Sequence, residues 1–346
     1  METKEYRLTD LCDFQGGTQP PKEEWINEPR DGFVRMLQIR DYTQDKAEHV
    51  GYVKDTKKLN KCEEDDILIG RYGASVGKIL TGLAGAYNVA IIKTIPNEEL
   101  ISKRYLYYVL TGTDFQNFIL NIGARAAQAG FNKNDLSFFK LHVPTSLEDQ
   151  EQISNVLEKA KILNSKREQS IDLLDEFLKM KFLEMFGDPV DNEKKWETIT
   201  LGEEIKIKHG FAFKSEFFSE KGKYVLLTPG NFYERGGYKD RVEKQKFYVG
   251  EVHDEYILEK HDILVAMTEQ APGLLGTPIL IPESKLFLHN QRLGLLKYNN
   301  KKFNKYFLFY LFCNKRIKDI IHAKAIGMKV RHTSPSKIEG MSIYLP

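Results

Sequence analysis

The sequence is poor in cysteine, and its few cysteines lie far apart. Cys12, Cys62 and Cys313 include no pair at the short spacing of zinc ligands, and an odd number does not suit a disulfide framework. Scattered cysteines of this kind are typical of reduced thiols in a cytosolic protein. We therefore expect a cytoplasmic protein with no metal site.

Long apolar runs are also missing. The first residues, METKEYRLTD, contain no apolar core of a signal peptide. The most apolar stretch, YFLFYLFC at 306–313, is far shorter than the roughly 20 residues that a membrane span needs. The sequence therefore predicts no membrane association.

Neither sign of charge is in large excess. The net charge is +2 and the pI about 8.1, while 41% of the residues are hydrophobic and 29% are charged. These fractions are those of an ordinary core-forming chain, and 346 residues suffice for two or three domains. Mild basicity permits a nucleic-acid partner, because such binding depends on where cations cluster rather than on their total.

Catalytic signatures are absent from the sequence as well. GASVGK at 73–78 has three residues between its glycines, whereas a phosphate-binding loop needs four, and Ile79 stands where that loop needs Ser or Thr. No H-E-x-x-H or G-x-S-x-G motif occurs, nor the (Asp/Asn)-Pro-Pro-(Tyr/Phe) motif of a DNA methyltransferase. The residues therefore show no catalytic constellation.

What the sequence does contain is one long helical stretch between two halves. Residues 148–185 lack proline and glycine, and apolar residues recur there at heptad spacing. That seam consists of Ile153, Leu157, Ala160, Ile171, Leu174 and Leu178. Thr145 and Glu148 fit a capping box at its start, and Gly187 followed by Pro189 ends it. At about 1.5 Å per residue the helix is roughly 57 Å long, and a lone helix of that length needs a partner to cover its seam.

The two flanking halves are versions of one pattern. Five segments of the first half have counterparts in the same order in the second. The pairs are 8–17 with 201–210, 33–42 with 224–233, 64–73 with 259–268, 103–112 with 304–313, and 131–144 with 332–346. β-Branched and aromatic runs between glycines indicate short strands, and the aromatic segments near 105 and 306 indicate a buried helix in each half. The sequence thus predicts an α+β fold of two homologous domains, each with mixed β-sheet and helices, joined by a long coiled-coil-type spacer helix.

Polar, basic and aromatic residues collect in glycine-rich loops of both halves. IGRYGASVGK is the strongest case, because it follows a strand ending at Ile69 and its glycines let the backbone come close to a ligand. Arginine reads guanine edges with two hydrogen bonds, while lysine and serine hold phosphates. Taken alone, each residue is more often a solvated surface residue, and recurrence in both halves is what supports the group. The candidate DNA contacts are Arg40, Arg71, Tyr72, Ser75, Lys78, Arg125 and Gln128 in the first half, and Lys214, Ser215, Asn231, Tyr233, Arg235, Gln270, Lys329, Arg331 and His332 in the second.

With these residues in place, the sequence resembles the DNA-specificity (S) subunit of type I restriction–modification systems. The resemblance rests on the related halves, on DILIGRYGASVGK in the first and GFAFKSEFF opening the second, and on VPTSLEDQEQISNVL and FLEMFGDP at the two ends of the helix. It covers essentially the whole chain. It implies a target-recognition domain at 1–145, a central helical spacer at 146–188 and a second target-recognition domain at 189–346.

The resemblance also implies what the chain does and with which partners. Each recognition domain reads one part of a bipartite, asymmetric site in double-stranded DNA, and the spacer sets the distance between the parts. The spacer also docks methyltransferase (modification) subunits, which methylate adenine with S-adenosylmethionine. A restriction subunit, an ATP- and Mg-dependent translocase and nuclease, cleaves unmodified DNA. S-adenosylmethionine, ATP and Mg are therefore expected on partner subunits and not on this chain.

One feature departs from the family pattern. In the family a second helical segment usually follows the second recognition domain and pairs antiparallel with the first, but this sequence ends at Pro346, the counterpart of Pro144. Either the chain is truncated or another chain supplies the missing helix, and we expect the isolated chain to self-associate through its uncovered seam. Two other functions stay open: the recognition subunit of another phage-defence methylation system, and a coiled-coil scaffold protein with no DNA role.

Overall fold

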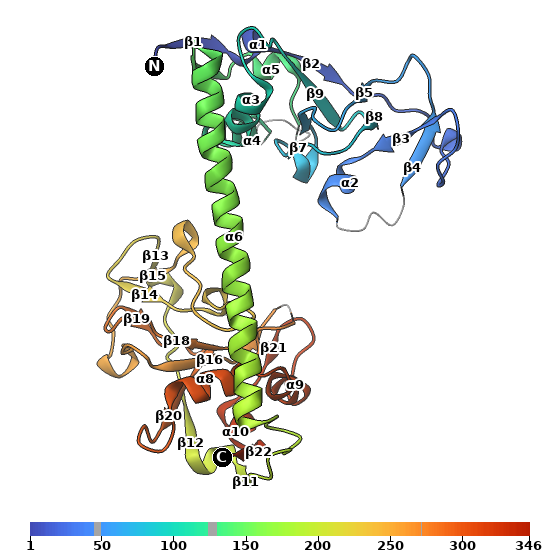
Figure 1. Ribbon diagram of the computed structural model, residues 1–346. Helices are drawn as coiled ribbons and strands as arrows, with labels where there is room; N and C mark the ends of the chain where they lie inside the picture. The colour runs from blue at the N-terminus through green and yellow to red at the C-terminus, as the bar shows by residue number, and fades with distance from the viewer. Residues whose placement is uncertain (45–49, 124–129, 271) are drawn as a thin grey trace. The chain divides into compact units, whose positions relative to one another are not determined.

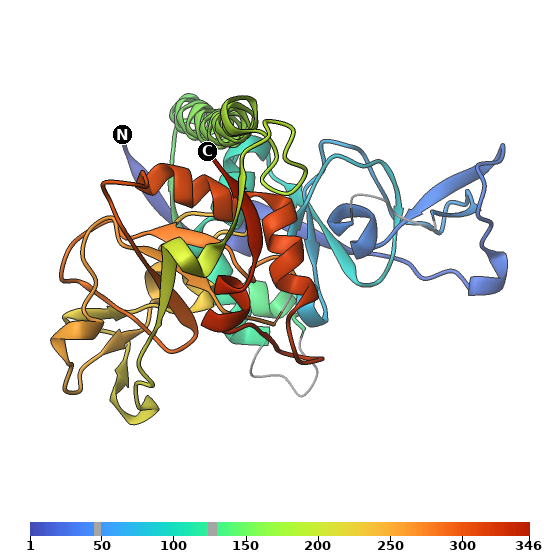
Figure 2. The ribbon, with the colours of Figure 1, turned by 90° about the horizontal axis from the view of Figure 1, so that it is seen from below.

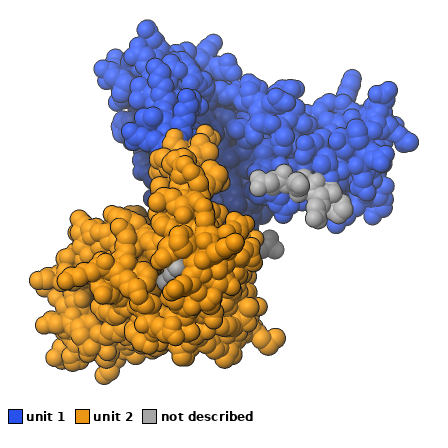
Figure 3. Space-filling model, turned by 60° about the horizontal axis from the view of Figure 1, so that its bottom comes forward, with its two compact units in different colours: residues 1–167 blue, residues 168–346 orange. Residues whose placement is uncertain are grey.

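A helix of 40 residues, α6 (Leu147–Phe186), runs between the two units of this computed structural model, which describes residues 1–44, 50–123, 130–270 and 272–346 (Figure 1). Unit 1 is Met1–Arg167 and unit 2 is Glu168–Pro346, so each unit contains about half of α6 (Figure 3). The helix predicted at 148–185 is confirmed, with one further residue at each end.

The sequence predicted the end of α6 correctly but not the residue that caps its start. The predicted capping box is wrong: Ser146 Oγ accepts the hydrogen bond from the N–H of Asp149 at 3.4 Å, while Thr145 Oγ1 donates to the carbonyl of Glu2. At the other end Gly187 has φ +73° and its N–H donates to Leu183 O at 2.7 Å. Glycine adopts this left-handed conformation without strain, and the helix therefore stops there.

The described residues of unit 1 form two four-stranded sheets and a separate strand pair. The first sheet is antiparallel, in the order β2 (Cys12–Gly16), β9 (Ile91–Pro96), β6 (Leu68–Gly70), β7 (Ile79–Leu80). The second has the order β4 (Gly51–Lys54), β3 (Phe33–Leu37), β8 (Gly85–Tyr87), β5 (Lys61–Cys62), with β3 and β8 parallel. The pair is β1 (Thr3–Arg7) with β10 (Lys140–Pro144). The helices besides α6 are α1 (Leu8–Leu11), α2 (Ile39–Thr43), α3 (Lys103–Thr111), α4 (Thr113–Gly123) and α5 (Lys133–Leu136).

Unit 2 repeats this plan. Its antiparallel sheet has the order β12 (Ile205–His209), β20 (Leu293–Tyr298), β16 (Ile263–Ala266), β18 (Pro278–Leu280). A second sheet has the order β13 (Phe218–Ser219), β15 (Phe247–Tyr248), β14 (Tyr224–Leu226), β19 (Phe287–Leu288). Two strand pairs complete it: β11 (Glu197–Thr200) with β22 (Ser342–Leu345), and β17 (Thr268–Glu269) with β21 (Arg331–His332). Its helices are α7 (Leu201–Glu204), α8 (Lys305–Cys313), α9 (Lys315–Ala323) and α10 (Pro335–Glu339).

The matched elements confirm the predicted α+β repeat. Within each unit a short helix runs into the first sheet strand, as α1 into β2 and α7 into β12, and a late short helix runs into a last strand, as α5 into β10 and α10 into β22. The predicted buried helices are α3 and α8, where Leu106, Leu110 and Leu308 are fully buried. In unit 2, α8 lies against β16 and β18, and α10 lies against β12 (Figure 2).

The glycines that end the first pair of repeated segments have the same structural reason in both units. A Cβ on Gly17 would lie 2.0 Å from Asn88 O, and a Cβ on Gly210 would lie 2.1 Å from Asn290 O. Each strand therefore passes so close to its neighbour that only glycine fits. Within the described residues, no helix is both long enough and apolar enough to cross a lipid bilayer.

Candidate nucleic-acid interface

The loop that connects β6 to β7 in unit 1 is a tight turn that glycines make possible. Gly70 N–H donates to Lys78 O at 2.9 Å, and Gly77 N–H donates to Gly70 O at 3.0 Å, so the two ends of the loop are tied together. A Cβ on Gly70 would lie only 2.3 Å from Ser75 O, and Gly77 has φ +79°. The loop is therefore closed and fixed, and its outward side chains are held in defined positions.

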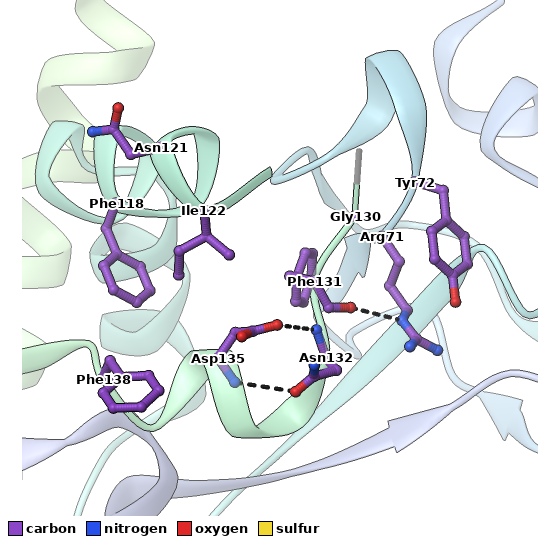
Figure 4. Close-up of a pocket in the computed structure, with 10 residues that line it drawn as sticks. All are labelled: Arg71, Tyr72, Phe118, Asn121, Ile122, Gly130, Phe131, Asn132, Asp135 and Phe138. Carbon is purple, nitrogen blue, oxygen red and sulfur yellow. Dashed lines mark hydrogen bonds between the residues drawn. The ribbon is translucent and has the colours of Figure 1, made fainter. Parts of the chain in front are cut away.

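Arg71 is placed by this loop with one edge of its guanidinium unoccupied. Its Nε donates to Phe131 O at 3.4 Å, and its Cζ lies 5.0 Å from the ring centre of Tyr72 (Figure 4). The terminal nitrogens make no hydrogen bond with any residue that the structure describes. A guanidinium that is oriented by one bond and a ring contact, with its outer edge open, suits two-bond recognition of guanine.

A hollow of about 850 Å³ lies beside Arg71 and Tyr72 (Figure 4). Aromatic and aliphatic side chains from α4 and from the segment around α5 form much of its wall, and Phe138 is 74% exposed. The lining residues are Arg71, Tyr72, Phe118, Asn121, Ile122, Gly130, Phe131, Asn132, Asp135 and Phe138. Exposed aromatic rings next to a cation offer stacking and methyl contacts to bases.

Of the other candidates of unit 1, Ser75 and Lys78 belong to the same loop, and Arg40 lies on α2. Ser75 Oγ donates to Tyr72 O at 2.7 Å, so this hydroxyl holds the loop itself, while Lys78 is exposed. Arg40 is exposed on α2, which packs on the buried cluster that includes residues of β6 and β7. Arg125 and Gln128 lie outside the described residues.

The loop after β16 in unit 2 is the structural equivalent of the Arg71 loop. Met267 N–H donates to Arg292 O at 2.9 Å, just as Arg71 N–H donates to Ala90 O at 2.8 Å. Thr268 then pairs with His332, in the place where Tyr72 bridges Gly130. In each unit, therefore, the loop after the sheet strand lies beside the segment that follows the paired helices.

Four candidates from two stretches of unit 2 that are distant in sequence lie at or next to the β17–β21 pair. The β17–β21 pair joins Thr268 to His332 and Glu269 to Arg331. Gln270 follows β17 directly, Lys329 lies just before β21, and Gln270, Lys329 and His332 are all exposed. Arg331 is half-buried, with Nη1 at 3.2 Å from Nδ1 and 3.0 Å from Nε2 of His322.

Glu269 connects these two stretches of unit 2, and it was not among the residues predicted from the sequence. The residue is 3% exposed, and its Oε2 accepts the backbone N–H groups of Gly273, Leu274 and Leu275 at 3.0, 3.1 and 3.0 Å. Its Oε1 lies 3.0 Å from His322 Nε2. The signal that could have found it is an acidic residue directly before a glycine-rich turn, since such a turn presents unpaired N–H groups.

The remaining candidates of unit 2 have different environments. Lys214 and Ser215 are exposed at a short 3₁₀ turn. Tyr233 is 40% exposed, with the cations of Arg235 and Lys239 at 5.1 and 5.6 Å from its ring centre.

Two of the predicted contacts are already bound inside the protein. Arg235 forms ion pairs with Asp172 and, at 3.1 Å, with Asp175, both on α6. The expectation for Asn231 needs correction, because its side chain is 1% exposed and its amide donates to Gln245 Oε1 at 2.8 Å. Asn231 holds the turn together and cannot reach a ligand.

The three cysteines are free, and no group of three His, Cys, Asp or Glu side chains among the described residues could ligate a metal ion. Burial raises the pKa of the Cys12 thiol to about 12 and that of Cys62 to about 11. These two thiols therefore stay protonated at neutral pH.

Most of the apolar seam of α6 is exposed. Leu157, Ile171, Leu174 and Leu178 are 40%, 48%, 59% and 41% exposed, Ala160 is exposed and Ile153 is half-buried. Other positions of the helix, such as Gln150 and Ser154 in unit 1 and Phe182 in unit 2, are buried in their own unit. Within the described part of the chain, the seam from Leu157 to Leu178 therefore keeps much of its apolar surface open.

Comparisons with known proteins agree with this organisation. The family model described as Type I restriction modification DNA specificity domain matches residues 1–173 and again 193–346. The type I restriction enzyme MjaVIII specificity subunit of Methanocaldococcus jannaschii is 23% identical over an alignment of 353 residues, which covers 98% of this chain and 81% of that protein. The crystal structure of a type I restriction–modification S subunit from M. genitalium matches with a TM-score of 0.53 at 16% identity, over 99% of this chain and 84% of that one. The structural match supports the fold alone.

Proposed function

Since this chain belongs to the type I restriction modification DNA specificity family, we propose that it reads a bipartite, asymmetric site in double-stranded DNA, one half-site with each unit. The family assigns it DNA recognition, and the chain is a non-catalytic component of a restriction–modification system. The observation that supports two half-sites is the repeated fold, in which a recognition loop follows the equivalent sheet strand of each unit. Homologous readers with different loop residues suit a site whose halves differ.

In unit 1 we assign base reading to Arg71 and Tyr72. The open edge of the Arg71 guanidinium provides the two donors that guanine accepts in the major groove, and the Tyr72 ring provides a surface for a base or methyl group. The exposed Lys78 and Arg40 then hold phosphates and set the register. We keep Arg125 and Gln128 as contacts of the same unit on their sequence alone.

In unit 2 we assign the corresponding role to the paired loops at β17 and β21. Gln270 and His332 are exposed there and are assigned to bases, and Gln270 has the amide that reads adenine with two hydrogen bonds. Lys329, which is also exposed, is assigned to a phosphate. Lys214, Ser215 and Tyr233 are exposed elsewhere in the unit and serve as phosphate or sugar contacts. Arg235 and Arg331 contribute only after leaving their present partners, Asp172 and His322.

We propose that α6 fixes the spacing of the half-sites and binds the catalytic partners. It is unbroken over 40 residues, so at about 1.5 Å per residue it is roughly 60 Å long. Its exposed seam is the kind of surface that a partner helix covers, here from methyltransferase subunits or from a second copy of the chain. S-adenosylmethionine then belongs to the methyltransferase subunits, and ATP and Mg to a restriction subunit.

The decisive experiment is to co-express the chain with its genomic neighbours in a methylation-free host and to sequence the DNA for modified adenines. The expected result is a single motif made of two short half-sites around a fixed unspecified spacer. No modified motif, with the methyltransferase shown to be present and intact, would refute the proposal.

Arg71→Ala tests the assignment of one reader to one half-site. Losing a two-bond guanine contact costs about 1–3 kcal/mol, so methylation should be lost or the motif relaxed in one half-site only. Arg7→Ala is the matched control, because Arg7 is exposed on β1, outside the recognition loops. Equal weakening of both half-sites would make Arg71 a phosphate contact or a structural residue.

Salt dependence separates this proposal from a coiled-coil scaffold without a DNA role, which the exposed seam alone would also suit. A chain that neutralises phosphates releases counterions, so its affinity for duplex falls steeply with salt. A scaffold protein would bind no duplex at any salt concentration. Recognition for another phage-defence methylation system would give the modified motif together with partners of a different kind.

A further inference from the structure

The turn between α9 and β21 in unit 2 has an unusually apolar tip. Met328 is 99% exposed, Ile326 is 68% exposed and Val330 is 36% exposed. Single exposed apolar residues are common on protein surfaces, but here three alternate along one short turn. Exposed apolar side chains are unfavourable in water, and a group of them indicates a binding surface.

The base of this turn is rigid. Ile326 and His332 exchange two backbone hydrogen bonds, at 2.9 and 2.8 Å, and Thr333 N–H donates to Met267 O at 2.9 Å. Gly327 has φ +112°, and a Cβ there would lie 2.0 Å from Val330 O. The apolar tip is therefore held out on a closed hairpin that is anchored to the recognition loop after β16.

The segment that carries the tip is rich in basic residues and has no acidic ones. The stretch 322–337 contains four Lys or Arg residues, two histidines and no Asp or Glu, although the whole chain has a net charge of only +2. The nearby carboxylate of Glu269 is buried against His322 and does not face the tip. An apolar tip between cations is matched by a duplex, which has phosphates on the outside and stacked bases within.

We propose that Met328 enters duplex DNA as a wedge between adjacent base pairs, while Lys329 and Lys324 hold the flanking phosphates. This inference rests on the proposed function and names how unit 2 engages its half-site. Architectural proteins insert Met, Leu, Ile or Phe in this way and kink the duplex. The long, flexible thioether suits an irregular gap between bases. Flexible pyrimidine–purine steps are the sites that unstack at least cost, so the wedge selects for such a step without a base-edge hydrogen bond.

The test uses the full chain and a duplex of about 40 base pairs selected from a random pool by the wild-type protein, with donor and acceptor dyes at its ends. Affinity and end-to-end shortening are measured for the wild type, Met328→Ala and Met328→Leu. Because burial of a Met side chain is worth on the order of tenfold or more in an equilibrium constant, Met328→Ala should bind about tenfold more weakly and lose the shortening. Met328→Leu should keep both. All variants should unfold like the wild type, since residue 328 makes no buried contact.

Lys329→Ala serves as the matched control on the same hairpin. It should weaken binding to every duplex and reduce the salt slope by about one, with the shortening retained. A Met328→Ala chain that binds and bends DNA like the wild type overturns the wedge. If that variant also fails to co-purify with the methyltransferase, the tip docks on protein instead. A wild-type chain that selects no duplex overturns the proposed function as well.

Discussion

Replacing Glu269 should destabilise unit 2 and impair one half-site, although the residue itself touches no ligand. Its Oε2 accepts three backbone N–H groups, at 3.0, 3.1 and 3.0 Å, from the turn that follows Gln270. Its Oε1 faces His322, which in turn contacts Arg331. The carboxylate thus joins the two stretches to which we assign base reading in unit 2.

The size of the effect follows from the burial of these groups. In Glu269→Ala the buried N–H of Leu275 is left without an acceptor, which costs about 1–3 kcal/mol. The N–H groups of Gly273 and Leu274 are half-buried and regain water, so each loses only about 0.5–1.5 kcal/mol. The total of about 4 kcal/mol corresponds to a melting temperature lower by roughly 8–16 °C for a unit of this size. Glu269→Gln keeps an acceptor oxygen and loses the charge, so its loss should be smaller.

Urea denaturation, followed by tryptophan fluorescence and by circular dichroism, measures the change in the free energy of unfolding. The methylation assay measures recognition of the two half-sites. We expect weaker recognition of the half-site assigned to unit 2 and unchanged recognition of the half-site assigned to unit 1. Glu220→Ala is the control, because it removes the same charge from an exposed position of the same unit. A Glu269→Ala chain with wild-type stability and an unchanged motif would refute the account of this carboxylate.

Two further predictions concern other parts of the molecule. Burial lowers the pKa of His289 to about 4 from 6.5, so the unfolded state binds the proton more readily than the folded state. The contribution of neutral His289 to the free energy of unfolding is fully present above pH 6.5, and about 3 kcal/mol of it is lost as the pH drops to 4. Urea denaturation at pH 7.5 and 5.0 should show about 2 kcal/mol of this loss. His289→Gln, which cannot titrate, should show a flatter profile, and parallel profiles would contradict the assignment. Leu174→Glu combined with Leu178→Glu should abolish self-association in light scattering at micromolar concentration without lowering stability, because both side chains are largely exposed. A wild-type chain that is already monomeric would contradict the role given to the seam.

The sequence was sufficient for the features that local rules determine. A stretch without proline or glycine and with heptad spacing predicts α6 nearly to its ends, since helix formation depends on those residues. The repeat was visible because glycines such as Gly17 and Gly210 are required by the same close approach in both units. The position of Ser146 as the cap was missed, because two neighbouring residues satisfy the same capping pattern and only the backbone decides between them.

The candidate site was less predictable, because it depends on contacts between distant segments. Nothing local indicates that the stretch leading to Gln270 pairs with the stretch that follows Lys329, since the β17–β21 pair that joins them is only two residues long on each side. Asn231 has a residue type that reads bases, yet its amide is used by Gln245 inside the protein. Residue type therefore identified which side chains could bind DNA, and tertiary structure decided which of them are exposed.

The equivalence of the two units explains why homologous readers need not read the same bases. The backbone N–H of Arg71 and that of Met267 make the same hydrogen bond to the same turn of their own unit. Yet Arg71 presents a half-exposed guanidinium, whereas Met267 is 1% exposed and belongs to the core. The position that we propose as a base reader in unit 1 is therefore buried in unit 2, where exposed residues are Gln270 and several of the hairpin 326–332. Under the proposal that each unit reads one half-site, the same scaffold with its exposed groups on different loops would contact different base steps, as an asymmetric site requires.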